Sequence, residues 1–176
     1  MGILQKLFGR KEETKRQDNV VRFTLKKDRE DARDYQYKRT SSASPLLPIV
    51  EVKNRPPIRY QENIGYCFAF AGIRALETEY LHLKPNKFLE LSEMYLGYNT
   101  RVLNGTIPND QGATIRDMLK ALTKWNAATE YVCPYQPSNL NKKPSWAAYA
   151  TSGLYKTKSY ERCYSVEDIK HALSQG

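Results

Sequence analysis

Apolar residues recur at helical spacing in several stretches of the chain, and the longest of these stretches begins at Cys67. From Ala69 to Tyr80 they return at every third or fourth position, which gathers them on one face of a helix. The spacing predicts an amphipathic helix over residues 67–81.

Three further helices are expected, each behind a residue that can cap a helix N-terminus. Thr114 precedes the apolar pattern of residues 115–122, and Asn126 is placed to end that helix. Shorter patterns follow Ser92 and Ser165. The chain is therefore predicted to be mainly helical between residue 67 and its C-terminus.

The other segments read as extended or irregular. Residues 1–44 are rich in charge and end in a serine cluster, which indicates an arm outside the core. Prolines punctuate a lead-in near residue 56 and a long loop over residues 134–144, and residues 154–160 alternate as a strand would. We divide the chain into a basic N-terminal arm or short pro-segment, 1–44, and one domain, 45–176.

Composition supports one folded domain and narrows its partners. The 176 residues are 40% hydrophobic and 11% aromatic, so the chain is not an intrinsically disordered segment. The net charge is +9, and residues 1–40 contribute 12 basic against 7 acidic residues. No nucleic-acid-binding motif accompanies this charge, so we expect no specific nucleic acid as a partner.

Targeting and redox signals are few. No window is long and apolar enough for a transmembrane anchor, and the short apolar stripe at the start is not a signal peptide. An odd number of cysteines without a secretion signal indicates a reduced environment, so a cytoplasmic or virion-associated location is expected. Cys133 and Cys163 with His171 match no zinc spacing, so neither a metal nor a cofactor is predicted.

Cys67 is the candidate for chemistry because it stands at the start of the longest predicted helix. Unpaired N–H groups and a partial positive charge at a helix N-terminus favour the nucleophilic thiolate form of a cysteine. Gln61 lies six residues upstream, so its side-chain amide and the Cys67 backbone N–H can together bind a developing oxyanion. The alternative is a cysteine that packs as a small buried hydrophobe.

Residues 61–70, with the sequence QENIGYCFAF, resemble the active-site stretch of papain-like cysteine peptidases of the bacterial and viral type. Further pieces resemble the family in the same order: the lead-in from residue 31, the Leu-Ser segment at 91–92, the helix after Gly112 and the Cys-Pro-Tyr at 133–135. The resemblance implies an α+β fold of two lobes, one helical and one a β-barrel, with the cleft between them. It places the chain mainly in the helical lobe, with the β-barrel lobe largely absent.

The family's roles are carried over position by position. Cys67 matches the catalytic nucleophile and Gln61 the oxyanion-hole glutamine, while Gly65 and Gly112 match substrate-binding positions. The resemblance thus implies a thiol protease that hydrolyses the bonds of a protein or peptide substrate through a thioester on Cys67.

Four positions of the motif depart from the family pattern. Glu62 replaces a glycine, Phe68 a tryptophan and Ile64 the disulfide cysteine of secreted members. Tyr66 replaces a serine or alanine, and we expect its larger side chain to narrow the cleft.

The catalytic histidine has no candidate in the chain. In the family it follows the nucleophile by about 130 to 150 residues, which lies beyond residue 176. His82 belongs to the far end of the Cys67 helix, and His171 reads as an exposed surface histidine. The domain is therefore expected to be truncated before its histidine, and the missing C-terminal β-barrel part or a partner chain must supply it. The alternative is a catalytically inactive papain-like protein with a binding or assembly role, which a downstream His and Asn would exclude.

Overall fold

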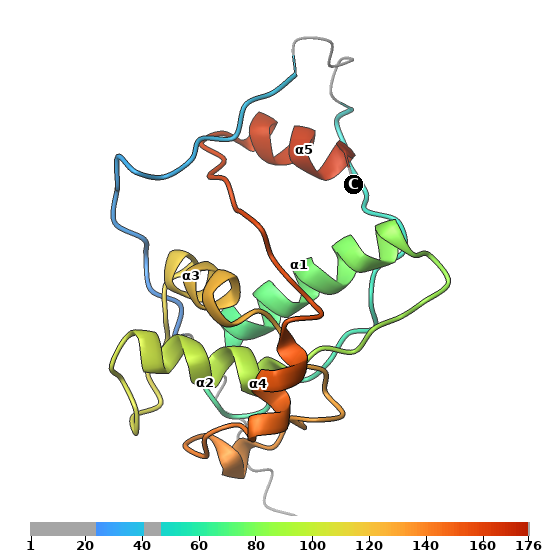
Figure 1. Cartoon of the computed structure of the whole chain (residues 1–176). Coiled ribbons are helices and arrows are strands. Elements are labelled where there is room, and N and C mark those ends of the chain that lie inside the picture. The colour runs from blue at the N-terminus through green and yellow to red at the C-terminus, as the bar shows by residue number, and fades with distance from the viewer. Residues whose placement is uncertain (1–23, 41–46, 176) are drawn as a thin grey trace, which may run out of the picture.

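Three helices pack against one another to form the centre of the fold in the computed structural model, which describes residues 24–40 and 47–175 (Figure 1). They are α1 (Cys67–Leu83), α2 (Glu93–Leu103) and α3 (Ile115–Trp125). The side chains of Ser92 and Thr114 accept the backbone N–H groups of Tyr95 and Asp117 and cap α2 and α3. The three corresponding sequence predictions are confirmed.

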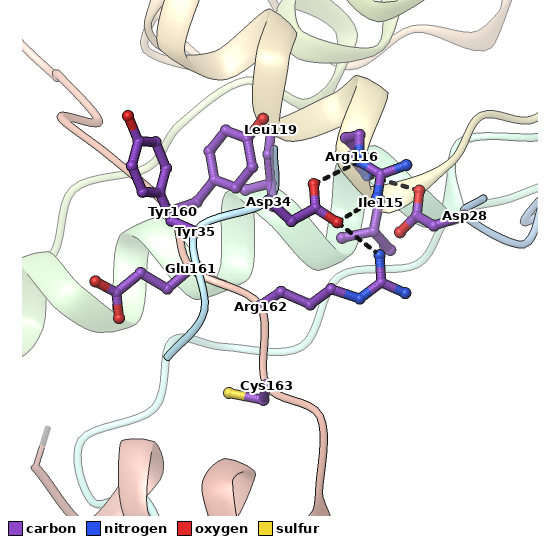
Figure 2. A pocket seen from close by; sticks show the side chains of 10 residues that line it. All are labelled: Asp28, Asp34, Tyr35, Ile115, Arg116, Leu119, Tyr160, Glu161, Arg162 and Cys163. Atoms are coloured by element: carbon purple, nitrogen blue, oxygen red, sulfur yellow. Dashed lines mark hydrogen bonds and ion pairs between the residues drawn. The ribbon is translucent and has the colours of Figure 1, made fainter. Parts of the chain in front are cut away.

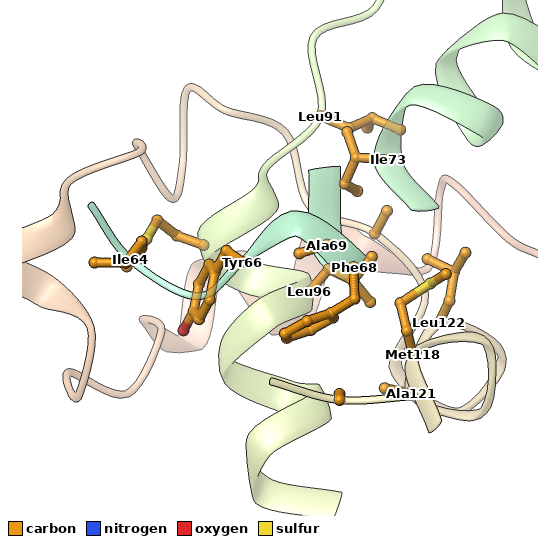
Figure 3. Close-up of a cluster of buried hydrophobic side chains, with 13 residues drawn as sticks. Ile64, Tyr66, Phe68, Ala69, Ile73, Leu91, Leu96, Met118, Ala121 and Leu122 are labelled. Atoms are coloured by element: carbon orange, nitrogen blue, oxygen red, sulfur yellow. The ribbon is translucent and has the colours of Figure 1, made fainter. Parts of the chain in front are cut away.

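The apolar faces of these helices form the main hydrophobic core (Figure 3). Its larger buried members are Tyr66, Phe68, Ile73, Leu91, Leu96, Met118 and Leu122. At the contact between α1 and α3, a Cβ on Gly72 would lie 2.3 Å from Met118 Sδ, so glycine allows the two helices to approach. The α1 face predicted from Ala69 to Tyr80 is thus the face that builds the core.

Three smaller helices follow: η1 (Pro137–Asn139), α4 (Trp146–Ser152) and α5 (Val166–Gln175). The predicted helix behind Ser165 is confirmed by α5, and Ser165 Oγ accepts the backbone N–H of Asp168. The sequence analysis missed α4, although Ser145 caps it and alanines fill it.

The expected strand over residues 154–160 is wrong. Among the described residues only isolated bridges form, and the one near this segment pairs Gln36 of the arm with Arg162. A strand needs a neighbour along its length to complete its hydrogen bonds, and the bridge to the arm forms at Arg162, beyond the end of this segment. In the part of the chain that the structure describes, the segment with the alternating pattern therefore forms no hydrogen-bonded pairing with a neighbouring strand.

A charged cluster is buried beside the core, where α1 and the start of α2 meet Arg59. Arg59 Nη2 lies 2.8 Å from Glu77 Oε1 and 2.7 Å from Glu93 Oε1. Glu77 also accepts the backbone N–H of Leu91 and pairs with Arg74. Both glutamate side chains are fully buried, and burial raises their pKa values, that of Glu93 to about 7.

Within residues 24–40 and 47–175, the structure contains no helix long and apolar enough to cross a membrane.

Candidate active site

Cys67 is the first residue of α1, half-buried at the end of the helix that carries the positive partial charge. The N-cap residue, Tyr66, makes no side-chain cap, and the first turn of α1 contains no acidic residue. The first N–H groups of a helix have no acceptor within the helix. The end of α1 is therefore suited to bind negative charge beside the Cys67 sulfur.

The turn that precedes Cys67 is fixed by hydrogen bonds centred on the Ile64 carbonyl. This oxygen accepts Nε2 of Gln61 at 2.6 Å and the backbone N–H of Tyr66 at 2.9 Å. The Gln61 carbonyl in turn accepts the hydroxyl of Tyr135 at 2.5 Å. A primary amide carries two N–H groups, so Gln61 can hold the turn with one and offer the other to a substrate.

Glu62, which stands where the family has glycine, has a φ of 59°. This left-handed conformation is the one that glycine adopts without strain. The departure therefore changes the residue and keeps the backbone conformation that a glycine would favour.

Gly65 is held by a carboxylate from the loop before α3. Its backbone N–H lies 3.0 Å from both Oδ1 and Oδ2 of Asp110. A Cβ on Gly65 would stand 2.8 Å from Thr24 Oγ1 and 3.0 Å from Asp110 Oδ1, so little room exists for a side chain.

Tyr66 does not narrow the cleft, and that expectation is wrong. Its side chain is fully buried in the core, against a helix position without a side chain: a Cβ on Gly97 would lie 2.2 Å from the Tyr66 ring (Figure 3). The Tyr66 hydroxyl accepts Nη1 of the buried Arg101 at 3.2 Å. The ring enters the core because α2 provides both space and a hydrogen-bond donor.

The arm reaches the predicted site, and Thr24 is its contact residue. Thr24 Oγ1 donates to the Gly65 carbonyl at 2.9 Å and lies 3.8 Å from Cys67 Sγ. At Gly112 a Cβ would fall 1.5 Å from the Thr24 carbonyl oxygen, so only glycine admits the arm there. The next contact is between backbones, where the Lys26 N–H donates to the Ala113 carbonyl at 3.1 Å.

Arg116, at the start of α3, fastens the arm beyond this contact (Figure 2). Its backbone N–H donates to Asp28 Oδ1 at 3.1 Å, and its guanidinium donates to the Arg29 carbonyl at 2.6 Å and to both carboxylate oxygens of Asp34. Arg162 adds a 3.0 Å contact to Asp34. These guanidinium groups hold the pKa of the Asp34 carboxyl below its ordinary value.

The same residues line a cavity of about 360 Å³ between the arm, α3 and the segment before α5. In this cavity the Asp34 carboxylate accepts hydrogen bonds from the guanidinium groups of Arg116 and Arg162, so the charged groups in its wall are already paired with one another. We assign it to the attachment of the arm.

Neither histidine lies where a catalytic base is needed. His82 is in the last turn of α1, about 22 Å along the helix from Cys67 at 1.5 Å per residue. His171 is buried, so the expectation of an exposed histidine is wrong: the arm covers it, and the Tyr37 hydroxyl lies 2.7 Å from its Nδ1.

The other two cysteines are less suited to nucleophilic chemistry. Burial raises the pKa values of the Cys133 and Cys163 thiols, and nearby carboxylates add to the effect at both. The described residues hold no cluster of His, Cys, Asp and Glu that would bind a metal ion.

The structure brings Cys67, Gly65 and Gly112 together around Thr24, and Gln61 onto the turn before the nucleophile. The sequence analysis missed Thr24 and Asp110. Asp110 directly precedes Gln111 and Gly112, but nothing local in the sequence indicates that its carboxylate reaches back 45 residues.

Comparisons with known proteins find relatives in sequence and in fold, although no model of a known protein family matches the chain. An uncharacterized peptidase C1-like protein of Acanthamoeba polyphaga mimivirus is 31% identical over 122 residues, which are 64% of this chain and 37% of that protein. Xylellain, a cysteine protease from Xylella fastidiosa, matches with a TM-score of 0.77 at 30% identity, over 88% of this chain and 63% of its own.

Digestive procathepsin L 3 of Tenebrio molitor larval midgut matches with a TM-score of 0.62 at 16% identity, over 81% of this chain and 46% of its own. This chain therefore spans less than two thirds of each of these three relatives.

Proposed function

The chain has the helical part of the papain-like cysteine peptidase fold, as its motifs predicted, and from this premise we propose that it carries the nucleophile of a cysteine-type peptidase. The observation that supports the proposal is the position of Cys67, at an uncapped helix N-terminus beside the Gln61 turn. In the reaction, the Cys67 thiolate attacks the carbonyl carbon of a peptide bond, the amine leaves with a proton, and water then hydrolyses the thioester.

Gln61 and the backbone N–H of Cys67 are proposed to stabilise the oxyanion, because charge develops on the carbonyl oxygen during the attack. Gly65 and Gly112 are proposed to let an extended substrate approach the nucleophile. Thr24 supports this role, since it already lies against both glycines, closer than a side chain would allow: a Cβ on Gly112 or Gly65 would overlap it, at 1.5 Å and 2.8 Å.

The base that takes the Cys67 proton and returns one to the leaving amine is proposed to come from the remaining part of the protein or from a partner chain. An apolar groove of about 770 Å³ between α1, α3 and residues 156–160 supports a β-barrel part as the missing piece. Its walls include Gly72, Leu76, Tyr80, Met118, Leu119 and Leu122. Covering these side chains removes apolar surface from water, which favours association.

The arm is proposed to act as a short pro-segment. Its backbone bonds to Ala113 and its Thr24 side chain lies beside Cys67, which is space that a substrate needs. Displacement or cleavage of the arm would then precede peptide hydrolysis.

The test is hydrolysis of fluorogenic peptides by the complete protein. We expect C67A to abolish hydrolysis, and Gln61→Ala to reduce kcat/KM on the order of 10²-fold, as for other lost oxyanion donors. Cys163→Ala, which removes a thiol outside the site, is the matched control and should retain activity. A complete protein that hydrolyses no peptide after removal of its arm would overturn the proposal and favour the inactive binding role.

A further inference from the structure

Besides the hydrogen bonds that its own residues donate to the Ile64 carbonyl, the turn before the nucleophile has a contact from outside the turn. The first residue after Ile64 is Gly65, whose N–H points to the loop between α2 and α3. There the two carboxylate oxygens of Asp110 each lie 3.0 Å from the Gly65 nitrogen.

The loop that carries Asp110 is itself fixed. The Asn109 carbonyl accepts Nε of the buried Arg101 at 3.2 Å, Nη2 of Arg101 at 3.0 Å and the backbone N–H of Gln111 at 2.9 Å. The Asn109 N–H donates to the Thr106 carbonyl at 2.8 Å. The residues on both sides of Asp110 are therefore held, so its carboxylate is a fixed acceptor.

Arg101 also links the loop to the next residue of the turn, because its Nη1 donates to the Tyr66 hydroxyl. The two residues directly before Cys67 are thus each held from the α2–α3 side, Gly65 through Asp110 and Tyr66 through Arg101. The Tyr66 N–H is occupied by the Ile64 carbonyl. With its neighbours engaged in this way, the Cys67 N–H has a set direction at the start of α1.

From this geometry we propose that Asp110 is a positioning residue for the peptidase reaction: by accepting the Gly65 N–H it fixes the turn that aims the Cys67 N–H and the Gln61 amide at the substrate carbonyl. The inference rests on the proposed function. Asp110 itself touches no reacting atom in this scheme. Its effect on the reaction is therefore expected in kcat, where the oxyanion is stabilised, with KM little changed.

The experiment compares D110A, D110N and D117A in the complete protein. D110A removes both acceptors from Gly65, while D110N keeps one amide oxygen in the same place. Asp117 is the matched control, since its carboxylate belongs to the adjacent first turn of α3, away from Gly65. A misplacement of about 1 Å can cost on the order of 100-fold in rate, and we expect a loss of kcat of up to that size in D110A, partial rescue in D110N and wild-type kinetics in D117A.

Hydrogen exchange of the backbone amide of Gly65 provides a readout that needs no peptidase activity. We expect faster exchange at this amide in D110A than in the wild type or D117A. Three results would each overturn the positioning role. They are an unchanged exchange rate at Gly65 in D110A, a change in the KM of D110A with kcat unaltered, and a D110N variant that is no more active than D110A. If the wild-type protein hydrolyses no peptide, the proposed function fails, and the exchange measurement still decides whether Asp110 holds the turn.

Discussion

At the residue scale, the side chain directly before the nucleophile shows how the core and the site depend on each other. The Tyr66 ring fills the space that a side chain at position 97 would occupy, and Arg101 donates a hydrogen bond to the Tyr66 hydroxyl. The pKa of Tyr66 is raised to about 12 by burial, so the hydroxyl stays neutral and can accept from the guanidinium. A substitution that displaces the Tyr66 ring is therefore expected to displace the adjacent residue, Cys67.

Gly97→Ala is expected to destabilise the fold although alanine is the better helix former. The new Cβ would stand 2.2 Å from the Tyr66 ring, and overpacking of a core costs about 1–3 kcal/mol, against a helix-propensity gain of about 1 kcal/mol. Urea unfolding of the complete protein checks this. Gly153→Ala is the control, because a Cβ there meets nothing within 4 Å; equal stability of the two variants would contradict the packing argument.

Cys67 could be identified from the sequence as the candidate nucleophile. The direction of the Tyr66 side chain beside it could not be predicted. Cys67 and Gln61 were found because the chemistry depends on local spacing. The orientation of Tyr66 depends on Gly97 and Arg101. Arg101 lies 35 residues away in the sequence, and both residues become neighbours of Tyr66 only when α2 packs on α1.

At the scale of the elements, the contact of α1 with the start of α2 includes an uncommon buried carboxyl. Burial raises the pKa of Glu93 to about 7, although the Arg59 guanidinium works in the opposite direction. In the unfolded chain the pKa of a glutamate is about 4.3. The folded protein therefore binds the proton more tightly than the unfolded protein between these two values.

Stability should consequently fall as the pH rises from about 4.5 to about 7, and level off above that. The shift corresponds to a loss of about 3–4 kcal/mol over this window. Glu93→Gln keeps the shape and removes the titration, so its urea midpoint should change less between pH 5 and pH 8 than that of the wild type. A variant with the same pH dependence as the wild type would show that Glu93 titrates near its ordinary value.

The helices could be predicted from the sequence, whereas the extended segments could not. Capping residues and apolar spacing act within one element, which is why α1, α2, α3 and α5 begin at the expected residues. Alternation over residues 154–160 is an equally local signal, but a strand exists only when another segment pairs with it. Only Gln36 and Arg162 form such a pair near this segment in the described part of the chain.

At the scale of the whole molecule, the arm joins parts of the chain that are far apart in sequence. It runs from Thr24 at Cys67, past Arg116 on α3, to Tyr37 at His171 of α5 (Figure 1). Such contacts leave no local pattern in the sequence, which indicated only a charge-rich arm. The charges of the arm are in part the groups that fasten it.

Arg116→Ala is expected to loosen the arm, because it removes the guanidinium that binds Asp34 and the Arg29 carbonyl. In the complete protein, limited trypsin cleavage within residues 24–40 should become faster, and Cys67 should be alkylated faster by iodoacetamide. Lys120→Ala, on an exposed position of the same helix, serves as the control. Equal cleavage and alkylation rates in both variants would contradict the role of Arg116 as the fastening of the arm.

The most direct test of the central claim is covalent labelling of the complete protein with an epoxysuccinyl peptide, followed by mass-spectrometric mapping of the modified thiol. In the wild type and, at a higher rate, in Arg116→Ala, we expect modification of Cys67, with Cys133 and Cys163 unmodified because their thiols are held in the neutral form. Labelling of all three cysteines at equal rates, or labelling that leaves Cys67 unmodified in Arg116→Ala, would contradict the assignment of Cys67 as the nucleophile.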